Sequence, residues 1–319
     1  MKYSVIVPLY NKEQYIERTL QSILSQTYAD YELIVVDDGS TDQSFNIAQQ
    51  TIGQDNPSRR IVRQPNSGVA AARNNGAAQS KGEYICFLDS DDWWEPTFLE
   101  EIDLLTTEYP EAGLYGTSFY LVKNGQQRVA PIGFDQGFQK GYINYCKTYA
   151  QTLCMPITSS SVAIPRNIFE ASGGFRTHLT LGEDFDLWIR LAISHPVAMV
   201  NKPLANYFQD LPPAKRATRR LHNPQSHMLW NLDHLAEKEA ADPDLKLLLD
   251  RLRGSGLYRY YLSRKYHNDA LSQLAKIDWT HMPRSVYRLY HSPLWLQRIR
   301  AAVLRIGSAA KQTLIKIKG

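Results

Sequence analysis

The sequence predicts an α/β protein in which a doubly wound, mostly parallel sheet is flanked by helices and followed by a C-terminal helical extension. Three short apolar runs support the sheet, and they occupy residues 3–9, 31–36 and 84–88. Near-continuous apolar runs of this length are typical of strands that are buried on both faces of a parallel sheet. The segments between these runs have helical spacing, so strands and helices alternate along this part of the chain.

The remaining elements follow from the same kinds of pattern. Apolar residues recur at helical spacing over residues 16–24, and Asn11 is the expected N-terminal cap of that helix. A second helix should follow Asp42, and an Ala-rich helix should span about residues 67–80. We expect further elements as follows: a strand near Ile61, strands at 113–122, 159–164 and 197–201, a turn at Asn124–Gly125, and a helix at 183–194.

Length and local composition indicate two domains. A chain of 319 residues is long enough for one large α/β domain and a smaller appendage. Residues 211–223 contain two prolines and four cations, and we interpret them as a loop at a domain boundary. The prediction is therefore a first domain of residues 1–210 and a helical C-terminal region of residues 211–319.

The composition excludes a disordered chain, because 43% of the residues are hydrophobic and only 21% are charged. The three cysteines, Cys86, Cys146 and Cys154, include no close pair, so we expect reduced thiols. The apolar run Val5–Val7 ends at Pro8 and is too short for a signal peptide, and no later run is long enough to span a membrane. We therefore expect a cytoplasmic protein.

The strongest chemical signal is the segment Asp89-Ser90-Asp91-Asp92, which directly follows an apolar run. Its three carboxylates repel one another unless a cation is present, and oxygen ligands suit a hard divalent ion such as Mg²⁺ or Mn²⁺. The alternative is an Asp-rich turn in which Asp92 caps the helix expected near Glu95.

Two further polar segments lie at strand ends of the predicted sheet, where such sheets bind their ligands. Asp38 can accept hydrogen bonds from a nucleoside, or it can belong to a turn into the next helix. Asn66 precedes the Ala-rich helix, whose N-terminus favours an anion. Arg73 lies on the buried side of that helix, so we expect it either to pair with a carboxylate or to contact a ligand.

Glu183 and Asp184 begin the helix expected at residues 183–194. The helix dipole favours carboxylates at that position, and capping alone explains Glu183. A carboxylate that faces a diphosphate in a cleft can instead act as a general base.

Five segments match a known family in order and spacing. They are residues 8–11 (Pro-Leu-Tyr-Asn), 36–42, 66–68 with 72–74, 88–92 and 182–188. In these segments the chain resembles the inverting glycosyltransferases of family 2, which have the GT-A fold. The resemblance covers residues 1 to about 205, and although each segment is short, five in order are specific.

The resemblance implies a role for each matching residue. Asp91, with Asp89, would bind a Mn²⁺ or Mg²⁺ ion that bridges the diphosphate. Asp184 would be the catalytic base, and Glu183 beside it would position the acceptor. The residues expected to hold the nucleotide are Pro8, Leu9, Tyr10, Asp38, Asn66, Arg73, Asp89 and Ser90. The family's compact Tyr-Arg-x-His arrangement is absent after Tyr207, and the remaining candidates for the diphosphate are Arg219, Arg220 and His222.

The implied reaction moves a sugar, with a UDP-sugar as the favoured donor, to a hydroxyl of a glycan or lipid-linked acceptor with inversion. Synthesis of a surface polysaccharide or glycan is the expected setting. Trp93 and Trp188 border the expected cleft and are candidates for stacking on an acceptor sugar, with core packing as the alternative.

Other functions stay open at this point. A nucleotidyltransferase that makes nucleotide sugars should carry a glycine-rich loop after the first strand, and residues 8–14 contain no glycine. A non-catalytic nucleotide- or membrane-binding protein would have no use for the carboxylates of Asp89, Asp91 and Asp184. No nucleic-acid-binding module is recognised, so we expect no nucleic-acid partner.

The C-terminal tail is basic and amphipathic. After Asp278 there are no acidic residues, whereas eight Lys and Arg residues follow. From about Pro293 the apolar residues Trp295, Ile299 and Val303 recur at helical spacing. Such a helix suits the surface of an anionic membrane, which would make the protein peripheral on the inner face of the membrane. The alternative is a last helix that packs on the catalytic domain and exposes its cations.

The membrane hypothesis predicts that the full chain co-sediments with anionic vesicles at low salt and is released by high salt, because salt screens the attraction of the cations. It also predicts that a chain ended at Ser292 stays in the supernatant, as should the full chain with neutral vesicles. Equal behaviour of the full and shortened chains would leave the tail with a purely structural role.

Overall fold

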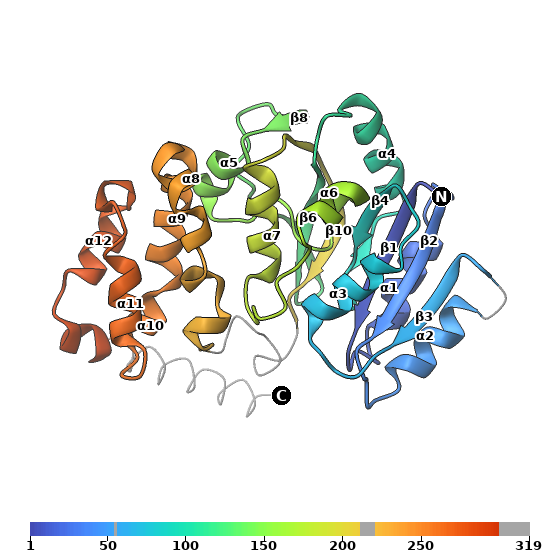
Figure 1. The fold of residues 1–319 in the computed structure, drawn as a ribbon, viewed down its shortest axis with the longest axis horizontal. Helices are drawn as coiled ribbons and strands as arrows, with labels where there is room; N and C mark the ends of the chain where they lie inside the picture. The colour runs from blue at the N-terminus through green and yellow to red at the C-terminus, as the bar shows by residue number, and fades with distance from the viewer. Residues whose placement is uncertain (54–55, 211–220, 300–319) are drawn as a thin grey trace. The chain divides into compact units, whose positions relative to one another are not determined.

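The computed structural model describes residues 1–53, 56–210 and 221–299. The chain divides into two compact units, Met1–Met228 and Leu229–Gly319 (Figure 1). The boundary expected at residue 211 lies at the start of a stretch outside the described residues. The predicted α/β class is confirmed, because helices flank a central sheet in the first unit.

The strands of the first unit form one sheet. Its order is β3-β2-β1-β4-β9-β6-β10-β5, with β7 paired to β6 and β8 paired to β10. The strands are β1 (Tyr3–Leu9), β2 (Tyr31–Asp37), β3 (Arg59–Arg63), β4 (Tyr84–Phe87), β5 (Trp93–Trp94), β6 (Leu114–Lys123), β7 (Gln126–Val129), β8 (Lys140–Ile143), β9 (Val162–Pro165) and β10 (Val197–Phe208).

The sheet contains parallel and antiparallel pairs, and its longest registers, β1 with β2 and β6 with β10, are parallel. β1 is parallel to β2 and β4, and β2 is parallel to β3, whereas β9 is antiparallel to both β4 and β6. The antiparallel pairs involve strands that come after residue 90, where the regular alternation of strand and helix ends. One cause is visible at Asn124 and Gly125, whose positive φ angles of 52° and 71° form the tight turn that brings β7 back along β6.

Helices cover both faces of this sheet. They are α1 (Ile16–Leu24), α2 (Ser44–Ile52), α3 (Val69–Ala78), α4 (Phe98–Glu108), α5 (Tyr145–Thr152), α6 (Arg166–Ala171) and α7 (Glu183–Ala192). Tyr3, Val5 and Val7 of β1 point into a core that includes residues of α1, α2 and α4. On the opposite face α3 lies so close to β1 that a Cβ on Gly76 would come within 2.4 Å of Ile6 Cγ2. Alternation along β1 thus produces a three-layer arrangement.

Two predicted local features differ in the structure. Asn11 does not cap α1, which begins at Ile16; Asn11 has a φ of 50°, and its side-chain oxygen accepts a hydrogen bond from the Thr41 N–H at 2.9 Å. The strand expected at residues 197–201 continues as β10 to Phe208, because its second half pairs with β6 on one side and β5 on the other.

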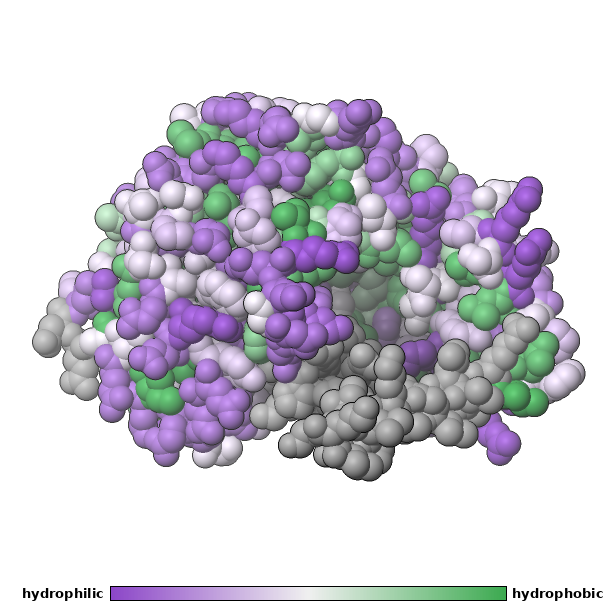
Figure 2. All heavy atoms as spheres, turned by 180° about the vertical axis from the view of Figure 1, so that it is seen from behind, coloured by the Kyte–Doolittle hydropathy of each residue, from purple (hydrophilic) through white to green (hydrophobic). Residues whose placement is uncertain are grey.

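None of the helices in the described residues is long and apolar enough to cross a membrane. On the face drawn in Figure 2, hydrophobic side chains occupy several separate areas among hydrophilic ones. The last described residues are helical, and Trp295 and Ile299 among them are 64% and 52% exposed. The rest of the predicted basic helix lies outside the described residues.

The second unit is helical, as its Leu-, Tyr- and Arg-rich sequence predicts. Its helices include α8 (Ala236–Ala241), α9 (Pro243–Gly256), α10 (Tyr258–Leu262), α11 (His267–Leu274) and α12 (Arg284–Tyr290), and the short 3₁₀ helix η6 (Trp279–His281). The Asp242 side chain caps α9 by accepting hydrogen bonds from the main-chain N–H groups of Asp244 and Leu245, and Pro243 occupies the first helical position.

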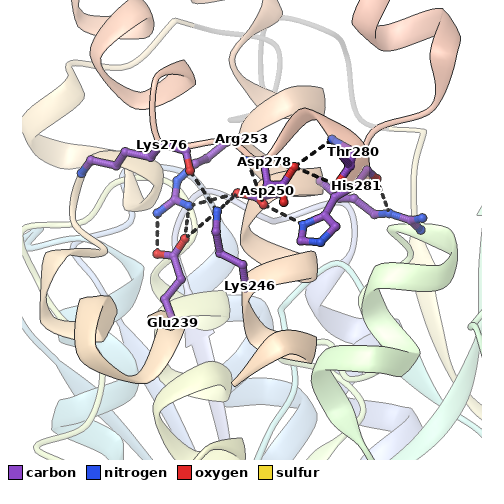
Figure 3. Close-up of polar contacts among 9 residues, drawn as sticks. Glu239, Lys246, Asp250, Arg253, Lys276, Asp278, Thr280 and His281 are labelled. Carbon is purple, nitrogen blue, oxygen red and sulfur yellow. Dashed lines mark hydrogen bonds and ion pairs between the residues drawn. The ribbon is translucent and has the colours of Figure 1, made fainter. Parts of the chain in front are cut away.

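A buried network of charges joins three parts of this unit (Figure 3). Asp250 of α9 is fully buried and pairs with Lys246 on the same helix and with His281 Nδ1 at 2.8 Å. Its second oxygen also accepts a hydrogen bond from the Asp278 N–H at 3.2 Å. Arg253, which is 1% exposed, donates two hydrogen bonds to the Glu239 carboxylate of α8. The network therefore ties α8 and η6 to α9.

Replacing Asp250 by Ala should destabilise the second unit, because Lys246, His281 and the buried Arg253 lose the carboxylate that all three contact. Removal of one partner from a buried pair costs about 3–5 kcal/mol in the free energy of unfolding. Urea denaturation followed by tryptophan fluorescence measures the change. As a control, Asp233→Ala removes an exposed ion pair with Lys276 and should change stability little. Equal effects of the two substitutions would show that the network is not stabilising.

Candidate active site

The predicted site residues follow strands that end at one edge of the sheet. In the parallel register, Ile6 of β1 lies beside Ile34 of β2 and Phe87 of β4, so the three strands run the same way and their carboxyl ends lie at the same edge of the sheet. The segments that follow them are residues 10–12, 38–40 and 88–92. This edge is where ligands bind in open α/β sheets.

Arg73 of α3 joins one of these segments, residues 88–92, to the start of α7. Its guanidinium donates from Nη2 to Asp89 Oδ1 at 2.6 Å and from Nη1 to Glu183 Oε1 at 3.1 Å. Arg73 is 3% exposed. Burial alone would lower the pKa of Arg73, but the neighbouring carboxylates raise it above its ordinary value. The expectation that Arg73 pairs with a carboxylate is thus confirmed. Its two partners, Asp89 and Glu183, lie 16 and 110 positions away in the sequence.

Asp184 lies in the first turn of α7, directly after Glu183. Burial raises its pKa to about 7, the charge of Glu183 adds to the increase, and Arg73 opposes it. Asp184 Oδ1 accepts a hydrogen bond from the Phe185 N–H at 2.7 Å, which orients the carboxylate. A carboxylate with a pKa near neutrality is suited to take and release a proton.

Asp91 and Asp92 are neighbours in sequence but have different surroundings. The Asp91 carboxylate pairs with the Lys12 ammonium; burial raises the pKa of Asp91, and Lys12 opposes that increase. Asp92 is 1% exposed and accepts hydrogen bonds from Ser160 Oγ and from the Phe208 N–H at 2.8 Å. It therefore holds the end of β10 and does not cap α4, which begins at Phe98.

The Asp38 carboxylate organises the loop before α3. It is 2% exposed and accepts hydrogen bonds from Gln64 Nε2 at 2.7 Å and from the N–H groups of Ser67 and Gly68, both at 2.8 Å. Gly39 has a φ of 77°, and a Cβ there would lie 3.0 Å from the main-chain nitrogen of Asn66. Asp38 thus places Asn66, and its own contact with a nucleotide stays a prediction.

Comparison with protein families decides the identity of this domain. Residues 4–158 match the family model described as Glycosyl transferase family 2. Residues 4–158 therefore belong to this family.

Relatives and solved structures agree with this assignment. The chain is 44% identical over 110 residues to glycosyltransferase GlyA of Streptococcus pneumoniae, a match that covers 34% of this chain and 15% of GlyA. It is also 44% identical over 98 residues to the putative teichuronic acid biosynthesis glycosyltransferase TuaG of Bacillus subtilis, covering 31% of this chain and 39% of TuaG. The matches thus span less than half the length of these relatives.

The fold is similar to that of the solved structure of S. aureus TarS, residues 1–349, in complex with UDP-GlcNAc. The TM-score is 0.72 at 20% identity, and the superposition covers 90% of this chain and 83% of that one. The predicted GT-A fold is thereby confirmed.

The other residues expected to bind the nucleotide differ in the exposure of their side chains. Pro8 and Leu9 are buried in β1, and the Leu9 carbonyl accepts the Asp38 N–H at 2.8 Å. Tyr10 is 46% exposed, and Asn66 is also exposed. Ser90 is 4% exposed. Tyr10 and Asn66 therefore offer side chains to a ligand at the surface, whereas Pro8 and Leu9 shape the strand end.

The two candidates for binding an acceptor sugar, Trp93 and Trp188, have different surroundings in the structure. Trp188 is fully buried and packs edge-on against Phe175, so it belongs to the core and cannot stack on a sugar. This corrects the prediction that Trp188 stacks on an acceptor sugar, because Trp188 is among the residues of α7 that are buried in the core. Trp93 is partly exposed, but its ring is covered on one face by the Arg18 guanidinium, 3.7 Å from the ring centre.

The diphosphate candidates are only partly described. Arg219 and Arg220 lie outside the described residues. His222 Nδ1 forms a hydrogen bond with Thr180 Oγ1 at 3.0 Å, and Leu181 forms a β-bridge with His227. The segment that follows the predicted cation-rich loop therefore lies beside the entry to α7.

Lys12 and Arg18 also lie at this site, although no sequence motif indicated them. Lys12 pairs with the Asp91 carboxylate, and Arg18 donates to the Asp91 main-chain oxygen at 2.8 Å. The available signal was the position of Lys12 directly after the matched segment at residues 8–11. Arg18 lies on an amphipathic helix, where a cation is expected to be solvated, so no pattern indicated its contact.

Replacing Arg73 by Gln should lower the free energy of unfolding of the first unit by about 1–3 kcal/mol, because Asp89 and Glu183 lose their shared cation. Chemical denaturation measures the change. Lys140→Gln is the control, since it removes an exposed pair with Glu108. A stability of Arg73→Gln equal to that of the control would contradict the structural importance assigned to Arg73.

Proposed function

We propose that this chain transfers a sugar from a UDP-sugar to the hydroxyl of a glycan or lipid-linked acceptor, with inversion at the anomeric carbon. The observation that best supports this proposal is that Arg73 joins Asp89 to Glu183, which is the neighbour of Asp184. The pKa of Asp184 is raised to about 7. Two comparisons support the substrate class: the similar TarS structure is a complex with UDP-GlcNAc, and TuaG is named for teichuronic acid biosynthesis.

A divalent cation, Mn²⁺ or Mg²⁺, is part of this proposal. No group of three or more His, Cys, Asp or Glu side chains is placed to hold a metal in the described part of the chain. Mg²⁺, however, is usually bound by one or two carboxylates together with substrate phosphates and water. Asp91 and Asp89 supply two carboxylates at the ligand-binding edge, so the residues present fit a metal that binds with the diphosphate. When bound, the ion would offset the charge that develops on the leaving diphosphate.

The protein's own groups account for the remaining steps. Asp184 accepts the proton of the acceptor hydroxyl while that oxygen forms a bond to the anomeric carbon. The bond from that carbon to the diphosphate oxygen breaks on the opposite face, and the diphosphate leaves with the electron pair. A single displacement of this kind inverts the configuration, as in inverting glycoside hydrolysis. Glu183, held by Arg73, fixes the start of α7 and so the direction of the Asp184 carboxylate.

The direct test is release of nucleoside diphosphate from a panel of nucleotide sugars, with Mn²⁺ and with a chelator, in the presence of candidate acceptors. The proposal expects turnover that requires a UDP-sugar, an acceptor and the metal. Absence of turnover with every donor, or turnover with nucleoside triphosphate and sugar phosphate instead, would contradict it.

Replacing Asp184 by Asn should lower turnover by about 10²–10⁴-fold, the usual contribution of a general base, with UDP binding unchanged. Because Asp184 acts in its ionised form, kcat/KM of the unsubstituted chain should rise with pH and level off above about 7. Steady-state kinetics over pH 5–9 and calorimetric titration with UDP measure the two effects. Near-normal turnover of Asp184→Asn would remove Asp184 from the role of base.

Replacing Asp91 by Ala should abolish the Mn²⁺ dependence of UDP binding, because one carboxylate cannot replace the pair in the metal's coordination. Titration calorimetry with UDP, with and without Mn²⁺, measures this. The matched control is Asp103→Ala, which removes a carboxylate paired with Lys2 and should leave the dependence intact. Unchanged Mn²⁺ dependence in Asp91→Ala would assign the metal to other residues.

A further inference from the structure

Lys12 is held beside Asp91 by its own main chain. Its N–H donates to Ser44 Oγ at 2.7 Å, and its carbonyl accepts the N–H groups of Tyr15 at 2.9 Å and Ile16 at 3.0 Å. Its ammonium pairs with the Asp91 carboxylate, and the two side chains are 24% and 12% exposed. A fixed main chain and a flexible four-carbon side chain leave the ammonium as the part that can move.

The contacts between α1 and this turn use main-chain oxygens of the turn and the Trp93 ring. Arg18 donates to the Asp91 main-chain oxygen at 2.8 Å and stacks on Trp93, and Thr19 Oγ1 donates to the Asp92 main-chain oxygen at 2.7 Å. None of these three contacts uses the Asp91 carboxylate. The ion pair with Lys12 can therefore open while the turn stays attached to α1.

The Lys12 ammonium and a divalent cation require the same carboxylate. Both are positive, so simultaneous binding at Asp91 brings like charges together, and the metal must displace the ammonium. A displaced ammonium needs a new anionic partner at this edge of the sheet. A diphosphate that arrives with the metal supplies one, because Lys is a common ligand of phosphate groups.

We propose that Lys12 is an internal competitor for the metal site: its ammonium occupies Asp91 until a divalent cation and a nucleoside diphosphate bind together, and it then moves to the diphosphate. The inference rests on the proposed function, because it assigns the metal to Asp91. Metal alone then binds weakly, and metal and nucleotide increase each other's affinity. This reciprocal coupling is the measurable consequence of the exchange.

The test measures Mn²⁺ affinity on the full chain by electron paramagnetic resonance of free Mn²⁺, with and without saturating UDP. In Lys12→Met, which is nearly isosteric and uncharged, Mn²⁺ should bind more tightly without UDP than it binds the unsubstituted chain. The factor by which UDP increases Mn²⁺ affinity should fall by about 5–150-fold, the usual range of a coupling between two sites. Lys12→Arg keeps the charge and should keep weak binding of Mn²⁺ alone.

Lys2→Met is the matched control, since Lys2 pairs with Asp103 at similar exposure, 25% for both side chains, away from the strand ends. It should leave both affinities unchanged. Equal or weaker binding of Mn²⁺ alone to Lys12→Met, relative to the unsubstituted chain, would overturn the competitor role while leaving the metal site intact. Absence of Mn²⁺ binding to every variant, with and without UDP, would overturn the metal site and this inference together.

Discussion

The buried guanidinium of Arg73 is the constraint on which the site depends. A charge that is 3% exposed is tolerated only when it is paired and hydrogen-bonded. Its two partners, Asp89 and Glu183, come from the end of β4 and the start of α7. Pairing therefore fixes three segments that are distant in sequence, and it places Asp184 next to an ion pair. The fold does not simply present these carboxylates; the guanidinium holds them together against their mutual repulsion.

Much of this arrangement could be predicted from the sequence, because the strand ends and the family segments coincide. The apolar runs predicted the bounds of β1, β2 and β4 to within about one residue. The expected burial of Arg73 indicated a carboxylate or a ligand as its partner. The contact of Lys12 with Asp91 could not be predicted, because it joins two loops 79 positions apart and no periodicity relates them. For Trp188 the structure selects core packing over sugar stacking, a choice that proximity in sequence to Asp184 does not specify.

Asp91 and Asp92 show why residue type alone does not assign a role. Both follow the same strand, yet Asp92 satisfies its oxygens on Ser160 and the main chain of Phe208, whereas Asp91 is balanced by the Lys12 ammonium. The difference arises from which neighbour each side chain meets after folding. The same holds in the second unit, where the helical pattern was evident but the pairing of Asp250 with His281 was not.

The central claim is that the strand ends around Arg73 form the donor site. The most direct measurement is a crystal structure of the chain with UDP and Mn²⁺. The account predicts UDP at the ends of β1, β2 and β4, the metal bonded to an Asp91 oxygen, the Lys12 ammonium released from Asp91, and Arg73 still paired with Asp89 and Glu183. UDP bound away from this edge, or a metal that does not contact Asp91, would contradict the account.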